Sequence, residues 1–507
     1  MARVISVFLP NWPIDRLRRG AGDTAPPVDV PLVVAAREKN RLVAVAADAV
    51  AQAAGARVGM VLTKAQVLVP NLVVVDHDPR ADADSLERLG LWMLQRVSPI
   101  VALDPPDGLI IDSTGADHLH GGETALLETL LGRLTMSGVT ARAAIADTWG
   151  AAHALARFVA SPSFVAPFGQ GEAILAPLPL EALRLPAQMA LDLRKLGFLS
   201  VGDVLAQPRA PLALRFGPEL GRRINQALGE IGEPIDPMRA EDLIEVRRPF
   251  AEPIGAPETI ARYVGKLVVA LCSELELRGL GARRLDLLCH RVDNTIEAVR
   301  VGMATPVRDI KRLTRLLCDK IETIAPGFGI EIMCLRATIV EPFDQHRSAN
   351  SLLEDTDPDI SDLIDTLSNR VGSRAIYRFS PVASDVPERS VARIAALAPE
   401  LGEGWPSHWP RPTRLLLRPE PIETIALLPD NPPVSITWRG IRRRVKRADG
   451  PERVFGEWWK ADIELSAVRD YFRIEDDTGE RYWVFRTGDG ENAETGSHKW
   501  FLHGIFG

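Results

Sequence analysis

The sequence predicts a multidomain protein of mixed α/β structure that ends in a β-rich extension. Its 507 residues exceed what one hydrophobic core usually supports, and this length suggests three or four domains. Short apolar runs alternate with helical stretches over the first 342 residues, which is typical of α/β domains. Beyond residue 400 the composition changes, because seven of the ten tryptophans lie at or after Trp405, beside the basic run at 441–448.

The composition indicates a soluble, cytoplasmic protein. Hydrophobic residues make up 46% and charged residues 25%, and no apolar run approaches the roughly 18 residues of a membrane span. The four cysteines show no CxxC or Cys/His ligand spacing, so we expect free thiols. The formal net charge of -7 argues against polyanion binding over the whole surface. We therefore expect no membrane contact, no cofactor, and nucleic-acid binding only through local basic faces.

Residues 1–170 are predicted to form one domain with an insertion. An apolar strand at 5–9 is followed by a helix at 83–96, strands at 100–103 and 109–111, a helix at 123–135, a strand at 141–146 and a helix at 148–159. The turn sequence DPPDG at 104–108 joins the two middle strands as a hairpin. This β-α-β-β-α-β order is ferredoxin-like, and apolar runs between about 20 and 80 form the α/β insertion.

Four further regions follow in the chain. Residues 171–238 are helical and resemble paired helix-hairpin-helix elements, while residues 239–342 return to mixed α/β structure. The polar, acidic stretch at 344–359 opens a linker and helical segment at 343–400. Residues 401–507 form a Trp- and Arg-rich region that we expect to bind partners.

Local strings in the first 342 residues carry a family resemblance. The string GARVGM at 55–60, an apolar helix, and VPNLVV at 69–74 are similar to the fingers pattern of Y-family DNA polymerases. The string LIIDSTG at 109–115 matches the family's palm strand that ends in Asp-Leu-Thr-Gly. This resemblance implies a ferredoxin-like palm, fingers at about 20–80, a helix-hairpin-helix thumb at 171–238 and an α/β little finger at 239–342.

The catalytic carboxylates of that family are largely missing here. Its phosphoryl transfer needs two metal ions about 4 Å apart, and three carboxylates normally hold them. On the resemblance, Phe8 and Pro10 stand where the first palm strand carries aspartates, and the Asp-Glu pair of the hairpin corresponds to Asp107 and Gly108. Asp107 is also an ordinary turn residue in Pro-Pro-Asp-Gly. We therefore expect no metal site and no polymerase activity.

The nucleotide-binding positions of the family have changed as well. Its Tyr-x-x-Arg on the fingers aligns with Ala49 and Gln52, which removes both triphosphate contacts. A lysine expected after the last palm strand is missing, and the sequence there is DTWG at 147–150. The resemblance therefore implies that binding of an incoming nucleotide is lost together with metal binding.

A closer resemblance concerns an inactive bacterial branch of the Y family that takes part in DNA-damage-induced mutagenesis. It rests on NWPIDRL at 11–17 and on C-terminal strings such as GPER at 450–453 and RYWVFR at 481–486. It implies an SOS-type adaptor that bridges DNA, the sliding clamp, a RecA-like accessory protein and an error-prone C-family polymerase. Two alternatives remain: an active translesion polymerase with a metal site relocated to Asp15, Asp104 and Asp112, and a plain DNA-binding protein.

Candidate DNA contacts lie in the thumb and the little finger. A helix-hairpin-helix grips the phosphate backbone through main-chain amides and nearby cations, and Arg222 and Arg223 follow such a turn at 216–218. Between residues 241 and 340, 15 Lys and Arg against 14 Asp and Glu give a net charge of +1, which predicts modest affinity. The candidates are Arg222, Arg223, Arg247, Arg248, Arg283 and Arg284.

Candidate protein contacts lie after residue 343. The candidate clamp-binding peptide consists of Gln345 with Leu352 and Leu353, although its spacing exceeds the usual Gln-x-x-Leu-Phe form. Between 405 and 460, 11 Lys and Arg against 6 Asp and Glu give +5, which fits either single-stranded nucleic acid or a protein interface. We expect Trp438 and Trp483 in a small β core. The candidate partner contacts are Arg443, Arg444, Trp458 and Trp459.

Overall fold

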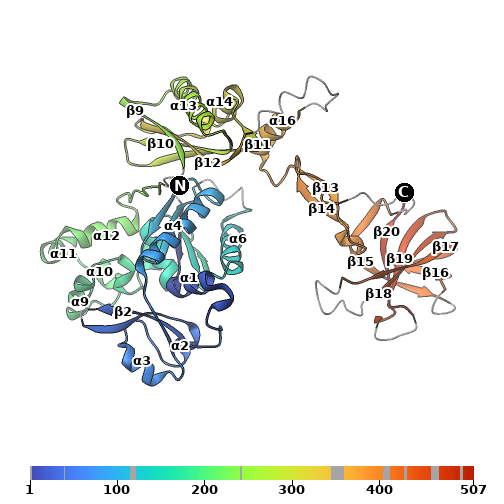
Figure 1. Cartoon of the computed structure of the whole chain (residues 1–507), viewed down its shortest axis with the longest axis horizontal. Helices are drawn as coiled ribbons and strands as arrows, with labels where there is room; N and C mark the ends of the chain where they lie inside the picture. Colours follow the sequence, from blue (N-terminus) through green and yellow to red (C-terminus); the bar gives the residue numbers. More distant parts are fainter. Residues whose placement is uncertain are drawn as a thin grey trace. The chain divides into compact units, whose positions relative to one another are not determined.

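The computed structural model describes most of the chain as two compact units, Met1–Asn369 and Arg370–Gly507 (Figure 1). The described residues are 3–38, 40–114, 121–239, 243–343, 359–402, 411–426, 431–457, 468–490 and 495–507. Within these ranges, no helix has both the length and the apolar character that a membrane crossing requires.

A five-stranded sheet with the order β5-β6-β1-β7-β8 forms the palm region of the first unit. Its strands are β1 (Val4–Phe8), β5 (Val101–Asp104), β6 (Gly108–Asp112), β7 (Arg142–Ala146) and β8 (Ser163–Val165). Because side chains alternate along β1, Ile5 and Val7 pack with α4 (Pro79–Arg96) and α6 (Glu123–Met136). Val4 and Phe8 pack on the other face with α7 (Trp149–Phe158). The expected β-α-β-β-α-β order is confirmed.

The insertion contains a three-stranded sheet with the order β3-β2-β4. Helix α1 (Trp12–Ala21) leads into it, and its elements are β2 (Leu32–Glu38), β3 (Arg41–Ala47), α2 (Ala49–Ala53), α3 (Leu62–Leu68) and β4 (Val73–Asp76). The Asp48 carboxylate caps α2, accepting a hydrogen bond from Ala51 N at 2.8 Å and one from Arg18 Nη2 at 2.7 Å. This cap fixes the helix that carries the altered nucleotide positions.

Short helices make up the thumb region. They are α8 (Gly171–Leu175), α9 (Ala187–Lys195), α10 (Val201–Leu205), α11 (Arg209–Phe216) and α12 (Pro218–Leu228). Gly217 alone separates α11 from α12, and its φ of 76° is one that glycine adopts without strain. A Cβ at Gly150 would lie only 2.9 Å from Ala227 Cα, so α12 approaches the start of α7 closely. Palm and thumb consequently share one hydrophobic core.

A second antiparallel sheet, β11-β10-β12-β9, forms the little finger region. Its strands are β9 (Ile244–Ile254), β10 (Leu280–Arg291), β11 (Ile296–Val307) and β12 (Ile330–Pro342), and α13 (Pro257–Leu277) and α14 (Ile310–Cys318) cover one face. Helix α16 (Ser361–Val371) lies along the edge strand β11. Asn369 exchanges two hydrogen bonds with the backbone of Gly302, and Asp365 Oδ1 accepts one from Ala304 N at 2.7 Å.

The second unit begins with a strand pair and continues as a closed barrel (Figure 1). The pair is β13 (Tyr377–Pro381) and β14 (Val391–Ala395), which the sequence does not predict. The barrel strands, in chain order, are β15 (Arg414–Ile425), β16 (Ser435–Trp438), β17 (Ile441–Phe455), β18 (Val468–Asp476), β19 (Arg481–Thr487) and β20 (Trp500–Ile505). Trp438 packs against one hydrophobic cluster of the barrel and Trp483 is buried in a second cluster on the other face of β19, so the expected β-rich extension is confirmed.

Candidate functional site

The candidate site lies at the edge of the palm sheet where β1 ends and β6 begins. The antiparallel register places Phe8 opposite Gly108. Leu9 N donates to Asp107 O at 2.8 Å, which holds the hairpin turn against the end of β1. The three residues that correspond in position to the family's catalytic carboxylates, Phe8, Asp107 and Gly108, therefore lie next to one another.

The guanidinium of Arg157, from α7, lies among these three positions. Its carbon is 4.7 Å from the centroid of the Phe8 ring, and its Nη2 donates to Asp107 Oδ1 at 2.8 Å. A Cβ added to Gly108 would lie 3.0 Å from the same Nη2 and 3.0 Å from Asp104 O, which is tighter than ordinary packing. A longer side chain at Gly108 would therefore require Arg157 to move.

Asp104 and His153 form a buried polar pair next to Arg157. His153 Nε2 and Arg157 Nη2 each lie 3.5 Å from Asp104 Oδ2. Burial, followed by the nearby Arg157 and Arg184, lowers the pKa of His153 to about 2, so its imidazole is neutral. Burial raises the pKa of Asp104, and Arg157 opposes that shift. Asp104 Oδ2, His153 Nδ1 and Arg157 Nη1 are buried without a hydrogen-bond partner among the described residues.

The side chains at this edge do not fit two catalytic magnesium ions. Magnesium prefers oxygen ligands, whereas Phe8 and Gly108 offer no side-chain oxygen and Asp107 is already paired with Arg157. A divalent ion placed here would also be repelled by the fixed charge of Arg157. Across the described part of the chain, no group of three His, Cys, Asp or Glu side chains is arranged to hold a metal ion.

The three aspartates considered as ligands of a relocated metal site have different hydrogen-bond partners in different parts of the palm region. Asp15 Oδ2 accepts a hydrogen bond from Thr140 N at 2.7 Å, and burial raises the pKa of its carboxyl group. Asp112 Oδ1 accepts one from Thr114 N at 2.9 Å. Asp104 lies beside His153. The described residues therefore give no support to a metal site built from these three aspartates.

The residues that align with the family's nucleotide-binding Tyr and Arg, Ala49 and Gln52, have no positive charge that could bind a triphosphate. Ala49 opens α2, and Gln52 Nε2 donates to Ala47 O at 2.6 Å. Asp147, in the region where the resemblance expects a lysine, accepts hydrogen bonds from Arg3 Nη1 and Gly169 N, both at 2.8 Å. These groups are engaged in holding the local backbone.

Both thumb candidates lie on α12 and share one carboxylate. Arg222 pairs with Glu219, and Arg223 Nε lies 3.0 Å from the other oxygen of Glu219. Arg223 also reaches Glu233 at 3.3 Å. The Arg222 side chain is 53% exposed and that of Arg223 is 25% exposed, so Arg222 is the more accessible to a phosphate.

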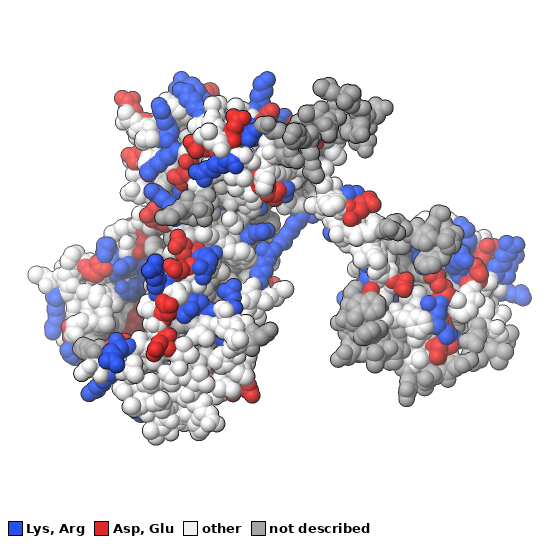
Figure 2. All heavy atoms as spheres, in the orientation of Figure 1, with Lys and Arg blue, Asp and Glu red and all other residues white. Residues whose placement is uncertain are grey.

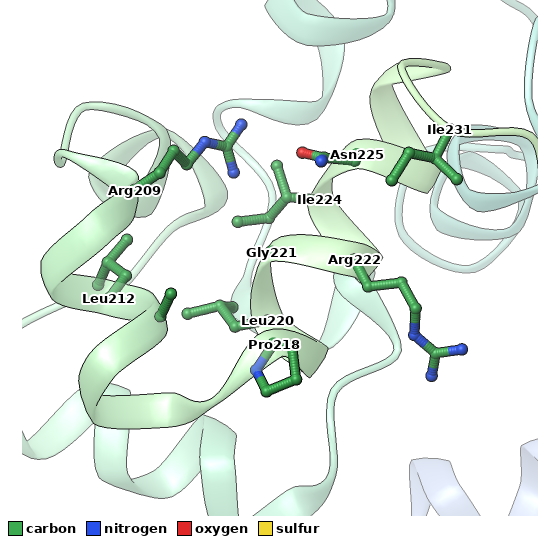
Figure 3. Close-up of a pocket in the computed structure, with 10 residues that line it drawn as sticks. Arg209, Leu212, Pro218, Leu220, Gly221, Arg222, Ile224, Asn225 and Ile231 are labelled. Atoms are coloured by element: carbon green, nitrogen blue, oxygen red, sulfur yellow. The ribbon is translucent and has the colours of Figure 1, made fainter.

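An apolar pocket of about 420 Å³ lies between α11 and α12, close to these arginines (Figure 3). Figure 3 shows Arg222 pointing away from the pocket, toward the outside of the hairpin. The labelled apolar side chains that line it are Leu212, Pro218, Leu220, Ile224 and Ile231.

The little finger candidates on β9 are exposed, and they face opposite sides of the sheet. Arg248 is on the helix side, with its guanidinium carbon 5.8 Å from the Tyr263 ring. Arg247 pairs in register with Cys334, on the alternate face. A single nucleic-acid strand therefore cannot contact both side chains in the same way.

The candidates on β10 are held more firmly than those on β9. Arg283 Nη1 lies 3.4 Å from Glu341 Oε2. Arg284 donates to Gln95 O at the end of α4, and burial, with the neighbouring Arg300, lowers its pKa to about 10. Arg284 is thus engaged with the palm region, whereas Arg247 and Arg248 are exposed.

The candidate partner contacts fall into two groups. Gln345, Leu352, Leu353, Trp458 and Trp459 lie outside the described residues. Arg443 and Arg444 are neighbours on β17 and therefore face opposite sides of it. Arg443 lies over the rings of Trp438 and Tyr482, at 5.5 and 5.4 Å, whereas Arg444 is exposed.

Sequence reasoning misses Arg157 and His153, although a signal for them exists. They are four residues apart in the alanine-rich stretch AAHALARF, so they lie on the same side of α7. Polar side chains on an otherwise apolar helix need buried partners. That pattern indicates a polar site under the helix, but it does not show that the site would be the palm edge.

Comparisons with known proteins agree with this fold. Residues 27–157 match the impB/mucB/samB family. Protein ImuB of Caulobacter vibrioides is 46% identical over 460 residues, which cover 89% of this chain and 99% of that protein. DNA polymerase IV of Halorhodospira halophila is 26% identical over 252 residues, covering 49% of this chain and 70% of that protein.

Among solved structures, DinB from Sulfolobus solfataricus aligns with 68% of this chain and 100% of its own chain, at 14% identity and a TM-score of 0.39. The family assignment depends on the sequence relatives, above all on the 46% identity that extends over nearly all of the Caulobacter protein. The chain belongs to the ImuB proteins, which are homologues of Y-family DNA polymerases.

Proposed function

We propose that the chain is a non-catalytic, polymerase-like adaptor in damage-induced translesion synthesis and mutagenesis. The observation that carries this proposal is the position of Arg157, whose guanidinium contacts Phe8 and Asp107 and restricts the space at Gly108. The guanidinium of Arg157, with a single positive charge, thus lies where the family resemblance implies two divalent metal ions. Such a cation neutralises Asp107 but cannot activate a hydroxyl group or coordinate a triphosphate.

The proposed partners follow from membership of the ImuB proteins. They are DNA, which the chain binds with modest affinity, the sliding clamp, an ImuA-type RecA-like protein and an ImuC-type C-family polymerase that performs the synthesis. For DNA, Arg222, Arg247 and Arg248 are the most accessible of the candidates. For the clamp, Gln345, Leu352 and Leu353 remain a prediction.

The test of inactivity is primer extension by the purified chain with magnesium or manganese and all four dNTPs. We expect no extension. Extension by the wild-type chain that disappears in Asp107→Ala would overturn the proposal, because it would assign a catalytic role to the remaining carboxylate.

A matched pair of variants tests the role of Arg157 directly. Phe8→Asp with Gly108→Glu restores the family's carboxylates while Arg157 stays in place, and a triple variant adds Arg157→Ala. We expect Mn²⁺ binding, measured by calorimetry, in the triple variant only, because Arg157 competes for the carboxylates and for the space. Equal Mn²⁺ binding by both variants would show that Arg157 does not block the site.

Co-purification with the clamp and with the C-family polymerase tests the bridging role. Deletion of residues 372–507 removes the second unit after α16 and leaves the first unit complete. We expect this deletion to abolish capture of the polymerase and to retain DNA binding by the first unit. If repair is unchanged by this deletion but lost on charge reversal of Arg222 and Arg223, the chain is a plain DNA-binding protein.

A further inference from the structure

The barrel carries a row of exposed cations on the outside of β17, hereafter the β17 row: Arg442, Arg444, Lys446 and Arg447. All four side chains are exposed, and none forms an ion pair with a carboxylate among the described residues. Figure 2 shows Lys and Arg side chains projecting at the edge of the second unit that carries β16 and β17. This row is a local positive surface on a chain whose formal net charge is -7.

The alternation of β17 separates this row from the barrel interior. Arg443 and Val445 point toward the core, where Arg443 lies 3.6 Å from Asp476 and over the Trp438 and Tyr482 rings. The residues between and beside them point outward. A register shift between Val445 and Arg447, opposite β18, adds one residue to the strand. This shift places Lys446 and Arg447 next to each other on the exposed surface.

The spacing of the row suits a chain of phosphates. Alternate residues on a strand lie about 6.8 Å apart, and the row from Arg442 to Arg447 extends over roughly 17 Å. The spacing of about 6.8 Å between alternate residues is comparable with the distance between successive phosphates of an extended nucleic-acid strand. On the neighbouring strand β16, the residues opposite Arg442 and Arg444 are Thr437 and Ser435, which bring no charge. Nearby carboxylates are Glu423 on β15, Glu475 on β18 and Asp477, whose backbone N donates to Arg444 O at 3.1 Å.

We infer that the β17 row binds the phosphate backbone of single-stranded DNA. A flexible single strand can follow the convex outside of a barrel, whereas a rigid duplex touches such a surface over a short arc. The contact is electrostatic and carries no sequence preference, since the row contains no exposed aromatic ring for base stacking. This inference deepens the proposed adaptor role with a second DNA contact, and it does not depend on the inactivity of the palm.

The test uses the full-length chain and a fluorescein-labelled oligothymidylate. Arg442→Gln, Arg444→Gln and Lys446→Gln are combined, and the control combines Arg414→Gln, Arg418→Gln and Arg481→Gln, which remove the same charge from other barrel strands. We expect the first variant to bind roughly one to two orders of magnitude more weakly and to lose about 2 from its salt slope, at about 0.7 per phosphate contact. We expect the control to bind as the wild type does. Unchanged thermal unfolding of both variants shows that folding is intact.

Photo-cross-linking of the same oligonucleotide locates the contact, and we expect adducts on β16 and β17. Equal losses in both variants would overturn the inference, because binding would then follow net charge. A loss confined to duplex DNA, or a loss of C-family polymerase capture with unchanged oligonucleotide affinity, would also overturn it. Primer-extension activity, which would refute the proposed inactivity, has no bearing on these measurements.

Discussion

The palm and the barrel each bury an arginine–aspartate cluster, but their hydrogen bonding differs. In the barrel, Asp470 is fully buried and accepts hydrogen bonds from Arg453 Nε at 2.7 Å and from Arg486 Nη2 at 2.8 Å. In the palm, Arg157 lies 3.5 Å from the buried oxygen of Asp104, which has no hydrogen-bond partner among the described residues. The barrel aspartate is closely coordinated, and the palm aspartate is not.

This difference teaches how the two clusters relate to function. A buried charge held by short bonds on both oxygens is typical of a structural element, whereas buried polar groups without partners need another explanation. In the palm, the loose cluster lies at the sheet edge that resembles the family's catalytic centre. Under the proposed function, Arg157 balances the negative charge of Asp104 and Asp107 at this edge.

Removing the barrel carboxylate should have the largest effect. Asp470→Asn removes the fully buried carboxylate that Arg453 and Arg486 share, and we expect the second unit to lose about 3–5 kcal/mol of unfolding free energy. Hydrogen exchange of the β18 and β19 amides measures this loss locally. Asp449→Asn is the control, because that carboxylate is 71% exposed and pairs with Arg473 at the surface. Equal effects of the two substitutions would contradict the structural role of Asp470.

Acid should destabilise the palm through His153. Its pKa is about 2 in the folded chain, against an ordinary value of 6.5, so the unfolded chain binds the proton more tightly. The contribution of neutral His153 to the unfolding free energy is present in full above about pH 6.5. It is lost progressively as the pH falls toward 2, and the loss is about 2 kcal/mol at pH 5. Unfolding of wild type and His153→Gln between pH 7 and 5 measures it, because the variant lacks this pH dependence.

The barrel offers a comparison for that titration. His503 is fully buried, and burial lowers its pKa to about 4. Neutral His503 also stabilises the folded chain above its ordinary pKa, and this contribution to the unfolding free energy is lost between about pH 6.5 and pH 4. We therefore expect His503→Gln to alter the acid stability of the second unit alone. If either variant changes the pH dependence of both units, the two effects are not local.

Removing the palm cation should cost less than removing Asp470. We expect Arg157→Met to lose about 1–2 kcal/mol, because Asp107 is 35% exposed and water can solvate it. The loss should shrink as the pH falls, because Asp104, whose pKa is already raised by burial, then takes up a proton and no longer needs a cation. Urea unfolding at two pH values tests this, with Arg133→Met, an exposed site on α6, as the control.

The smallest effect on stability is expected in the thumb. Glu219→Ala removes the carboxylate that Arg222 and Arg223 share at the surface, so unfolding should change little. The freed arginines should instead raise duplex DNA affinity a few-fold and steepen its salt dependence by about 1–2. Fluorescence anisotropy measures this change. An unchanged affinity would indicate that neither arginine contacts DNA.

The local elements could be predicted from the sequence, while the long-range pairings could not. The hairpin at 100–112 follows from two apolar runs around a Pro-Pro-Asp-Gly turn, and the positions of Phe8 and Gly108 follow from the family resemblance. The approach of Arg157 to them depends on how α7 packs on the sheet, and no local pattern encodes it. Closure of the barrel likewise depends on pairing β15 with β20, whose partner residues lie 78 to 91 positions apart, from Ile422–Trp500 to Arg414–Ile505.

Helix α16 has a consequence for how the chain can be shortened. Its Asn369 and Asp365 side chains occupy backbone groups of Gly302 and Ala304 on the outermost strand of the little finger. A chain cut at residue 343 would leave these groups uncovered, and an open strand edge invites pairing with a second molecule. Fragments that end before α16 should therefore aggregate, whereas fragments that include residue 371 should remain monodisperse in light scattering.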